Sequence, residues 1–176
     1  DKAIRFLRDR GITQAVAQRN RLSSQTVFMP QAGEKVSAIC FPYYRGGELV
    51  NAKYRDGKKR FRMEKGAERV LFGLDDIDPA CTVIVEGEFD KLACEVAGWP
   101  NVVSVPDGAP TPETKNYASK FEFLNDERVE SVERWIIAVD CDEPGERLSE
   151  ELCRRFGKNR CLIVEWPEGQ KDANDV

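Results

Sequence analysis

The 176-residue sequence contains no histidine, so neither metal binding nor acid–base chemistry in it can depend on imidazole. Its six cysteines form no C-x-x-C pair, and without histidine they offer no ordinary zinc ligand set. No apolar run approaches the roughly 20 residues that cross a bilayer, and no signal peptide is visible. These absences predict a protein of the cell interior with reduced core thiols, no zinc site and no membrane contact.

Charge is distributed unevenly along the chain, although the net charge is only −4. Residues 1–78 hold 16 Lys+Arg and 10 Asp+Glu, whereas residues 79–176 hold 11 and 21. The length allows one domain or two small ones, and the composition is that of an ordinary globular protein. A basic half joined to an acidic half suits a site with metal on one side and a polyanion on the other. Two solvated surfaces of differing composition would give the same totals.

The pattern of apolar residues changes near residue 79. Before it, the spacing predicts helices over 2–9 and 14–19, an irregular segment over 22–35, and strands over 36–44, 49–54 and 60–63. After it, strands over 82–85, 102–105, 135–139 and 161–165 alternate with helices over 89–97, 112–124 and 144–156. We therefore predict a basic α+β subdomain with an antiparallel meander (1–78), followed by an α/β subdomain with a parallel sheet and flanking helices (79–176).

Acidic residues directly follow two of the predicted parallel strands. Glu86 follows the strand over 82–85, and Asp140 follows the strand over 135–139, with Asp142 two residues farther on. Ligands bind beyond the carboxyl ends of such strands, where two like charges about 4 Å apart repel by about 4 kcal/mol. A divalent cation removes that repulsion, and oxygen ligands favour Mg²⁺ or Mn²⁺. Alternatively, the aspartates cap the next helix, and Glu86 and Glu88 lie at a helix N-terminus.

These acidic motifs have the form of a known family. Val85-Glu86-Gly87-Glu88 with Asp90, followed by Asp140-Cys141-Asp142, resembles a Toprim domain, the fold of primases, topoisomerases and related nucleases. Ala52-Lys53-Tyr54-Arg55-Asp56, Asp140–Gly145 and Lys171-Asp172-Ala173-Asn174 narrow the resemblance to the primase half of phage and organellar Twinkle-like primase–helicases. The match covers most of the chain from about Val36.

The resemblance implies a role for each residue that matches a motif. Glu86, Asp140 and Asp142 would be catalytic: Glu86 as general base or metal ligand, and the two aspartates as ligands of magnesium. Asp172 would complete a second metal site, with Asp90 as a nearby ligand, so the resemblance implies two Mg²⁺ or Mn²⁺ ions. The basic residues expected at nucleotide phosphates and template are Lys53, Arg55, Lys59, Arg62 and Lys171. Tyr43, Tyr44, Tyr54 and Phe61 lie in or near this basic segment and either stack bases or pack the hairpin onto its neighbours.

Three functions are compatible with these residues. The first is template-directed synthesis of short RNA primers on single-stranded DNA from NTPs, which makes the chain a DNA primase and nucleotidyltransferase. The others are a catalytically silent Toprim DNA-binding module attached to a helicase, and a Toprim nuclease. No P-loop and no cysteine-rich zinc module are present, so we expect the core fragment of a larger primase or primase–helicase. Its helicase and zinc-binding partners would lie outside the fragment, in a bacterial or phage-infected cytoplasm and nucleoid, or in an organelle.

Overall fold

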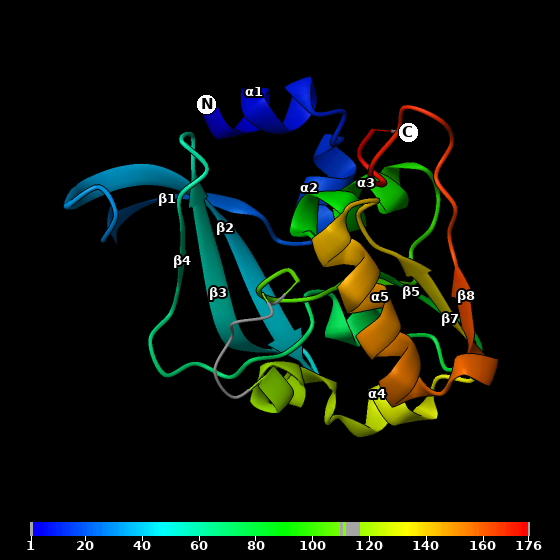
Figure 1. The fold of residues 1–176 in the computed structure, drawn as a ribbon. Helices are drawn as coiled ribbons and strands as arrows, with labels where there is room; N and C mark the ends of the chain where they lie inside the picture. The colour runs from blue at the N-terminus through cyan, green and yellow to red at the C-terminus, as the bar shows by residue number, and fades with distance from the viewer. Residues whose placement is uncertain (1, 110, 112–116, 176) are drawn as a thin grey trace.

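The computed structural model describes residues 2–109, 111 and 117–175. It contains a four-stranded antiparallel sheet, in the order β1-β2-β3-β4, and a four-stranded parallel sheet, in the order β6-β5-β7-β8. Figure 1 shows them side by side, with helix α5 in front of the parallel sheet and α1 above the antiparallel one. The predicted fold class, a parallel α/β unit preceded by a small α+β unit with a meander, is confirmed.

The helices and strands follow one another in the predicted order, and their bounds are as follows. The antiparallel strands are β1 (Ser23–Met29), β2 (Glu34–Arg45), β3 (Glu48–Asp56) and β4 (Phe61–Met63). The parallel strands are β5 (Thr82–Val85), β6 (Val102–Ser104), β7 (Trp135–Ala138) and β8 (Cys161–Ile163). The helices are α1 (Lys2–Asp9), α2 (Gln14–Arg19), α3 (Glu88–Val96), α4 (Glu127–Ser131) and α5 (Glu143–Phe156), with 3₁₀ turns η1 (Leu74–Asp76), η2 (Tyr117–Leu124) and η3 (Lys158–Arg160). None of the helices in the described part of the chain has the length and apolar character needed to cross a membrane.

The structure differs from the sequence-based expectation in three places. The segment expected to be irregular over 22–35 contains β1, an edge strand that pairs along its whole length with β2. The helix expected over 112–124 is a 3₁₀ helix over 117–124, and residues 112–116 lie outside the described residues. The short helix α4 was not predicted; Asp126 caps it by accepting a hydrogen bond from the N–H of Arg128.

Residues of the antiparallel sheet alternate between two faces, and this alternation decides which side chains reach the parallel sheet. Phe41 pairs with Lys53, and Ile39 pairs with Arg55, so all four lie on the inner face. Tyr54 pairs with Cys40 and with Arg62, and these three lie on the outer face. On the inner face, Phe41 makes edge-on contacts with the rings of Phe72 and Phe89.

One hydrophobic core joins the two sheets. It extends from Phe41 and Tyr43 of the antiparallel sheet through Ile84 and Ile137 of the parallel sheet to α5, where Phe156 stacks on Trp135. An isolated bridge pairs Phe72 with Ser104, so the connecting segment also adds to the edge of β6. The boundary near residue 78 coincides with the change of sheet; that residues 1–78 and 79–176 act as separate subdomains stays a prediction.

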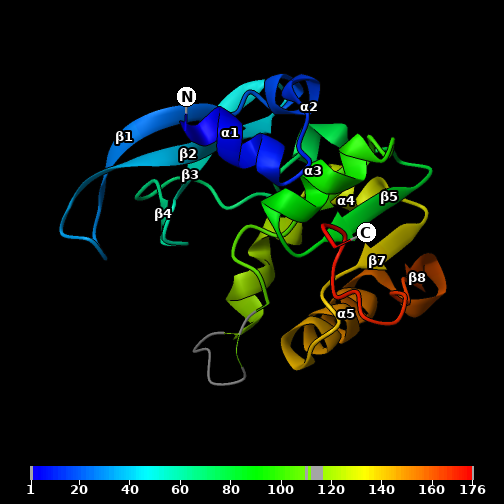
Figure 2. The same cartoon turned by 90° about the horizontal axis from the view of Figure 1, so that it is seen from above.

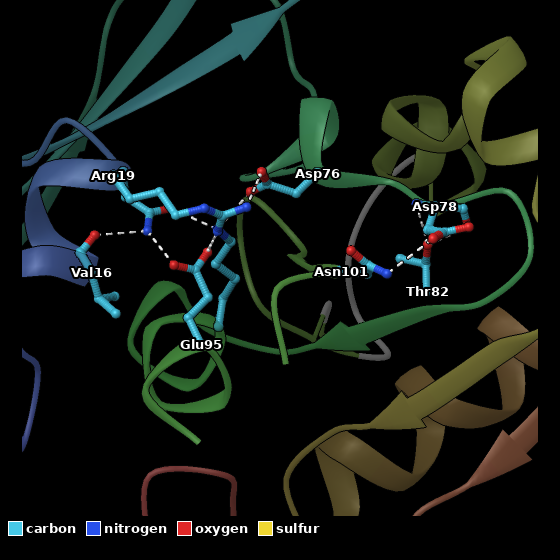
Figure 3. Close-up of polar contacts among 9 residues, drawn as sticks. Val16, Arg19, Asp76, Asp78, Thr82, Glu95 and Asn101 are labelled. Atoms are coloured by element: carbon cyan, nitrogen blue, oxygen red, sulfur yellow. Dashed lines mark hydrogen bonds and ion pairs between the residues drawn. The ribbon is translucent and has the colours of Figure 1, made fainter. Parts of the chain in front are cut away.

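A buried ionic network attaches α3 to its neighbours (Figure 3). Lys91 of α3 is fully buried, and its Nζ donates to Asn20 Oδ1 at 2.6 Å, to Asp76 Oδ2 at 2.7 Å and to Glu95. Arg19 of α2 bridges the same two carboxylates, at 2.9 Å from Asp76 and 2.5 Å from Glu95. Because α3 begins at the candidate site described below, this network holds in place the helix that leads out of that site.

We expect Lys91→Met to lower the free energy of unfolding by about 3 kcal/mol, because it leaves two carboxylates short of a buried cation. Urea denaturation measures the change. The control is Lys158→Met, since Lys158 is exposed and its loss should change stability by no more than about 0.5 kcal/mol. Equal stability of the two variants would show that the network does not hold α3.

Candidate active site

Glu86 follows β5 directly, and one of its carboxylate oxygens has no hydrogen-bond partner among the described residues. Its Oε1 accepts a hydrogen bond from the N–H of Ala109 at 3.1 Å. Its Oε2 is buried and receives no hydrogen bond from the part of the chain that the structure describes. Burial, together with the nearby charge of Asp142, raises the pKa of Glu86 above its ordinary value. An unsatisfied buried carboxylate oxygen is costly, so it marks a place where a cation or a proton donor fits.

Asp140 lies at the end of β7, which is hydrogen-bonded to β5. Burial, and then the charges of Glu86, Asp172 and Asp142, raise the pKa of Asp140 to about 7. Asp142 caps α5, because its Oδ1 accepts from the N–H of Gly145 at 2.9 Å. Because β5 and β7 are neighbours, Glu86 and Asp140 lie at the same edge of the sheet, and their charges interact. Asp142 also has the helix-capping role that was the alternative for this motif.

Asp90 and Asp172 come from two other elements, and their charges act on Asp140 or on each other at this edge of the sheet. In the first turn of α3, Asp90 Oδ2 accepts from the N–H of Gly87 at 2.9 Å. Burial, followed by the charges of Asp172 and Asp140, raises the pKa of Asp90 to about 8. Asp172 Oδ1 accepts from the N–H groups of Asn174 at 2.8 Å and Asp175 at 3.0 Å.

The C-terminal segment is held beside these strand ends by two contacts. The Lys171 carbonyl accepts from the N–H of Cys141 at 2.8 Å, and Arg10, which directly follows α1, donates to Asn174 Oδ1 at 3.1 Å. Figure 2 shows the segment returning past α3 toward the end of β7. Arg10 has no counterpart among the predicted site residues, because nothing in its local sequence indicates that α1 folds back onto the C-terminal segment.

The five predicted metal ligands thus perturb one another electrostatically, as the shifted pKa values of three of them record. Even so, no three acidic or cysteine side chains in the described ranges are already arranged to hold a metal ion. Asp90, Asp142 and Asp172 each accept a hydrogen bond from a backbone N–H, at 2.9, 2.9 and 2.8 Å. Hard oxygen donors and the orphaned Glu86 Oε2 fit Mg²⁺ or Mn²⁺. The catalytic and metal-binding roles of these residues stay predictions.

Raising the pH should destabilise the metal-free protein. Unfolded aspartates ionise near pH 3.9, whereas the folded protein holds the pKa of Asp140 at about 7 and that of Asp90 at about 8. Their contribution to stability is therefore fully present below the unfolded value and is lost as the pH rises through the folded values. After a discount for the solvent around half-buried Asp140, we expect a loss of about 2 kcal/mol between pH 5.5 and 8.5.

Urea denaturation in EDTA at several pH values measures this loss. Adding Mg²⁺ at pH 8.5 should restore most of it, because a bound cation stabilises the ionised form of the carboxylates. A stability that is flat or rising over this pH range would mean that the carboxylates do not share one crevice.

Two of the predicted nucleotide-binding residues lie on the inner face of β3. Lys53 Nζ donates to Glu88 Oε1 at 2.7 Å and to the Pro106 carbonyl at 2.8 Å, at the end of β6. The Arg55 guanidinium is buried and lies 5.1 Å from the Phe6 ring centre and 5.0 Å from that of Phe89. Lys53 therefore contacts the loop that follows β6, whereas Arg55 lies against rings of α1 and α3.

The other three predicted basic residues are not gathered with them. Arg62 lies on the outer face, over the Tyr54 ring at 5.5 Å, and donates to the Phe28 carbonyl at 3.1 Å. Lys59 is exposed in the turn between β3 and β4, and Lys171 is exposed beside Asp172. Among the aromatic residues, Tyr43 and Tyr54 are buried and pack within the fold, whereas Phe61 is 42% exposed.

Comparison with known proteins agrees with this geometry. The model of the Toprim domain family matches residues 80–164. Residues 80–164 therefore form a Toprim domain. A primase homolog protein of Arabidopsis thaliana is 41% identical over 185 residues, covering 97% of this chain and 53% of that protein. The Twinkle homolog protein, chloroplastic/mitochondrial, of Arabidopsis thaliana is 42% identical over 181 residues, covering 95% of this chain and 25% of that protein.

This chain is also similar to solved structures of primases. The crystal structure of the primase fragment of the bacteriophage T7 primase-helicase protein has a TM-score of 0.76 and 27% identity to this Toprim protein. The match covers 96% of this chain and 66% of that fragment. The resemblance to Toprim-domain primases of the Twinkle-like group is thereby confirmed. The chain spans about half the length of the Arabidopsis primase homolog and a quarter of that of the Twinkle homolog.

Proposed function

We propose that this Toprim protein synthesises short RNA primers on single-stranded DNA, as the core of a primase or primase–helicase. The observation that carries the proposal is the convergence of Glu86, Asp140 and Asp90 at the carboxyl ends of β5 and β7, facing the cations of β3. Its relatives named as primases, which match along almost the whole chain, support the same reaction.

The acidic side of the crevice would hold the catalytic ions. Glu86, Asp140 and Asp142 are the proposed ligands of one Mg²⁺ or Mn²⁺, and Asp90 and Asp172 complete the site of a second. When bound, such ions activate the attacking 3′-hydroxyl and stabilise the charge on the leaving pyrophosphate. The chain itself supplies negative oxygens on a rigid sheet edge and, at Glu86, a carboxylate of raised pKa that can accept the proton of that hydroxyl.

The basic side would hold the nucleotide and the template. Lys53 is placed to contact triphosphate oxygens, since its ammonium lies beside the Pro106–Ala109 loop that also contacts Glu86. Arg55 and Arg10 add positive charge behind it, since Arg10 and Arg55 both lie over the Phe89 ring. Exposed Lys59 and Phe61 at the β3–β4 hairpin extend this surface toward a single strand, through phosphate contact and base stacking.

The proposed partners are single-stranded DNA, NTPs, a helicase domain or helicase protein, and a zinc-binding module. The helicase partner is supported by the T7 relative, which is a primase-helicase protein. We propose an intracellular place of action, in a bacterial or phage-infected cell or in an organelle, and the name of the Twinkle homolog favours the organelle.

Extension of a preformed primer tests the proposal without depending on a zinc module for start-site recognition. A short RNA annealed to a DNA template, labelled NTPs and either Mg²⁺ or Mn²⁺ should give template-dependent addition of nucleotides. Shortening of labelled DNA without any addition would show a nuclease instead. Tight DNA binding with neither reaction, under both metals, would show the silent binding module.

A further inference from the structure

Glu88 links the two sheets through a buried ionic contact. It is the first residue of α3 and is only 4% exposed. Its Oε1 accepts hydrogen bonds from the Tyr43 hydroxyl of β2 at 2.5 Å and from Lys53 Nζ of β3 at 2.7 Å. Tyr43 is fully buried, so it provides a fixed donor on the other side of this oxygen.

This contact leaves the Lys53 ammonium with a single unassigned donor. Lysine carries three N–H groups on a flexible stem, and two of them here are directed at Glu88 and at the Pro106 carbonyl. Pro106 follows β6 and leads into the loop whose Ala109 N–H contacts Glu86. No described residue accepts the third N–H; the ammonium lies 5.2 Å from the centre of the Phe61 ring, and the side chain of Lys53 keeps 12% of its surface exposed.

A buried ion pair between two sheets has a large desolvation cost, and apolar residues of similar volume would hold the core together at a lower one. Orientation is what the ion pair adds: two charge-assisted hydrogen bonds fix both the position and the direction of an otherwise mobile ammonium. Glu88 also cancels the charge of Lys53, which by itself would weaken attraction for an anion. The two effects have opposite signs, so an experiment can separate them.

We propose that Glu88 is a positioning residue that orients Lys53 toward the phosphates of the incoming nucleotide, with Tyr43 fixing Glu88 in turn. This rests on the nucleotide-binding role proposed for Lys53. Neither Glu88 nor Tyr43 touches the nucleotide; each acts through Lys53.

The test measures ATP affinity by calorimetry in EDTA, where no metal takes part, and separately KM and kcat for primer extension. Glu88→Gln should weaken ATP binding about tenfold and raise KM with little change in kcat, because the hydrogen bond that orients Lys53 loses the charge that strengthens it. Tyr43→Phe should weaken binding about threefold. The matched control is Glu95→Gln, which breaks another buried ion pair of α3 and should change ATP affinity less than twofold.

A double-mutant cycle decides between positioning and a general structural role. In a Lys53→Ala background, Glu88→Gln should cause no further loss of ATP affinity, because its effect passes through Lys53. A further tenfold loss in that background, or tighter ATP binding by Glu88→Gln alone, would overturn the proposal. If Lys53→Ala by itself leaves ATP affinity unchanged, the nucleotide role of Lys53 is wrong and the positioning role fails with it, whereas primer extension by the unaltered protein stands as a separate result.

Discussion

Replacing Asp140 with asparagine should lower the rate of primer extension by at least about 1,000-fold while leaving the fold intact. Asp140 lies at the end of β7, where the charges of Glu86, Asp172 and Asp142 act on it together. Asparagine has the same shape, but it is neutral and has a single acceptor oxygen, so it is a poor ligand for a hard cation. The variant should also be more stable than the unaltered protein in EDTA at pH 8.5, because one member of a repelling set has lost its charge.

The opposite signs of these two effects make the experiment informative. A variant that merely misfolds would lose activity and stability together. The control is Glu143→Gln, since Glu143 is an exposed neighbour that pairs with Arg147 on the surface of α5, and the activity of this variant should stay within about twofold of the unaltered protein. Activity of Asp140→Asn within about fivefold of the unaltered protein would remove Asp140 from the reaction.

Gly145→Ala should destabilise the protein by at least about 3 kcal/mol and lower activity by about 100-fold or more. A Cβ at this position would lie 2.0 Å from the Asp140 carbonyl oxygen and 2.9 Å from its carbonyl carbon. Both are backbone atoms and cannot rotate away, so the first turn of α5 or the end of β7 must move. Either movement displaces Asp140 from the other carboxylates, which is why a single added methyl group should affect the chemistry.

Thermal unfolding and primer extension together measure this effect. Gly57→Ala is the matched control, because a Cβ there would meet no atom within 4 Å. It should change stability by no more than about 0.5 kcal/mol and leave extension unaffected. A Gly145→Ala protein as stable and active as Gly57→Ala would show that α5 does not press on the Asp140 backbone as described.

Sequence periodicity predicted most of the strands and helices, and the exceptions share a physical cause. The strand β5 (Thr82–Val85) lies at the predicted bounds because its apolar run is buried on both faces. In contrast, β1 is mostly exposed and largely polar, so nothing local indicated a strand; it forms because β2 offers a free edge. Long-range pairing of this kind leaves no signal in the segment itself.

The candidate site was predictable to the extent that it depends on strand ends. Glu86 and Asp140 could be placed together because parallel neighbouring strands bring their carboxyl ends to one edge. The positions of the basic residues were harder to predict, because the face of the sheet on which each side chain lies depends on the exact register of the β3–β4 hairpin. That register places Arg62 opposite Tyr54, on the face away from Lys53 and Arg55. The burial of Glu88 depends on Tyr43 from a distant strand, and local sequence does not encode that contact.

Anomalous diffraction from a crystal soaked in Mn²⁺ and an NTP tests most directly whether the carboxylate crevice is a divalent-metal site for nucleotidyl transfer. We predict manganese peaks within about 2.0–2.3 Å of carboxylate oxygens of Glu86 and Asp140, with the triphosphate of the NTP extending toward Lys53. Manganese bound only elsewhere on the protein, with Glu86 and Asp140 left unliganded beside a bound nucleotide, would contradict it.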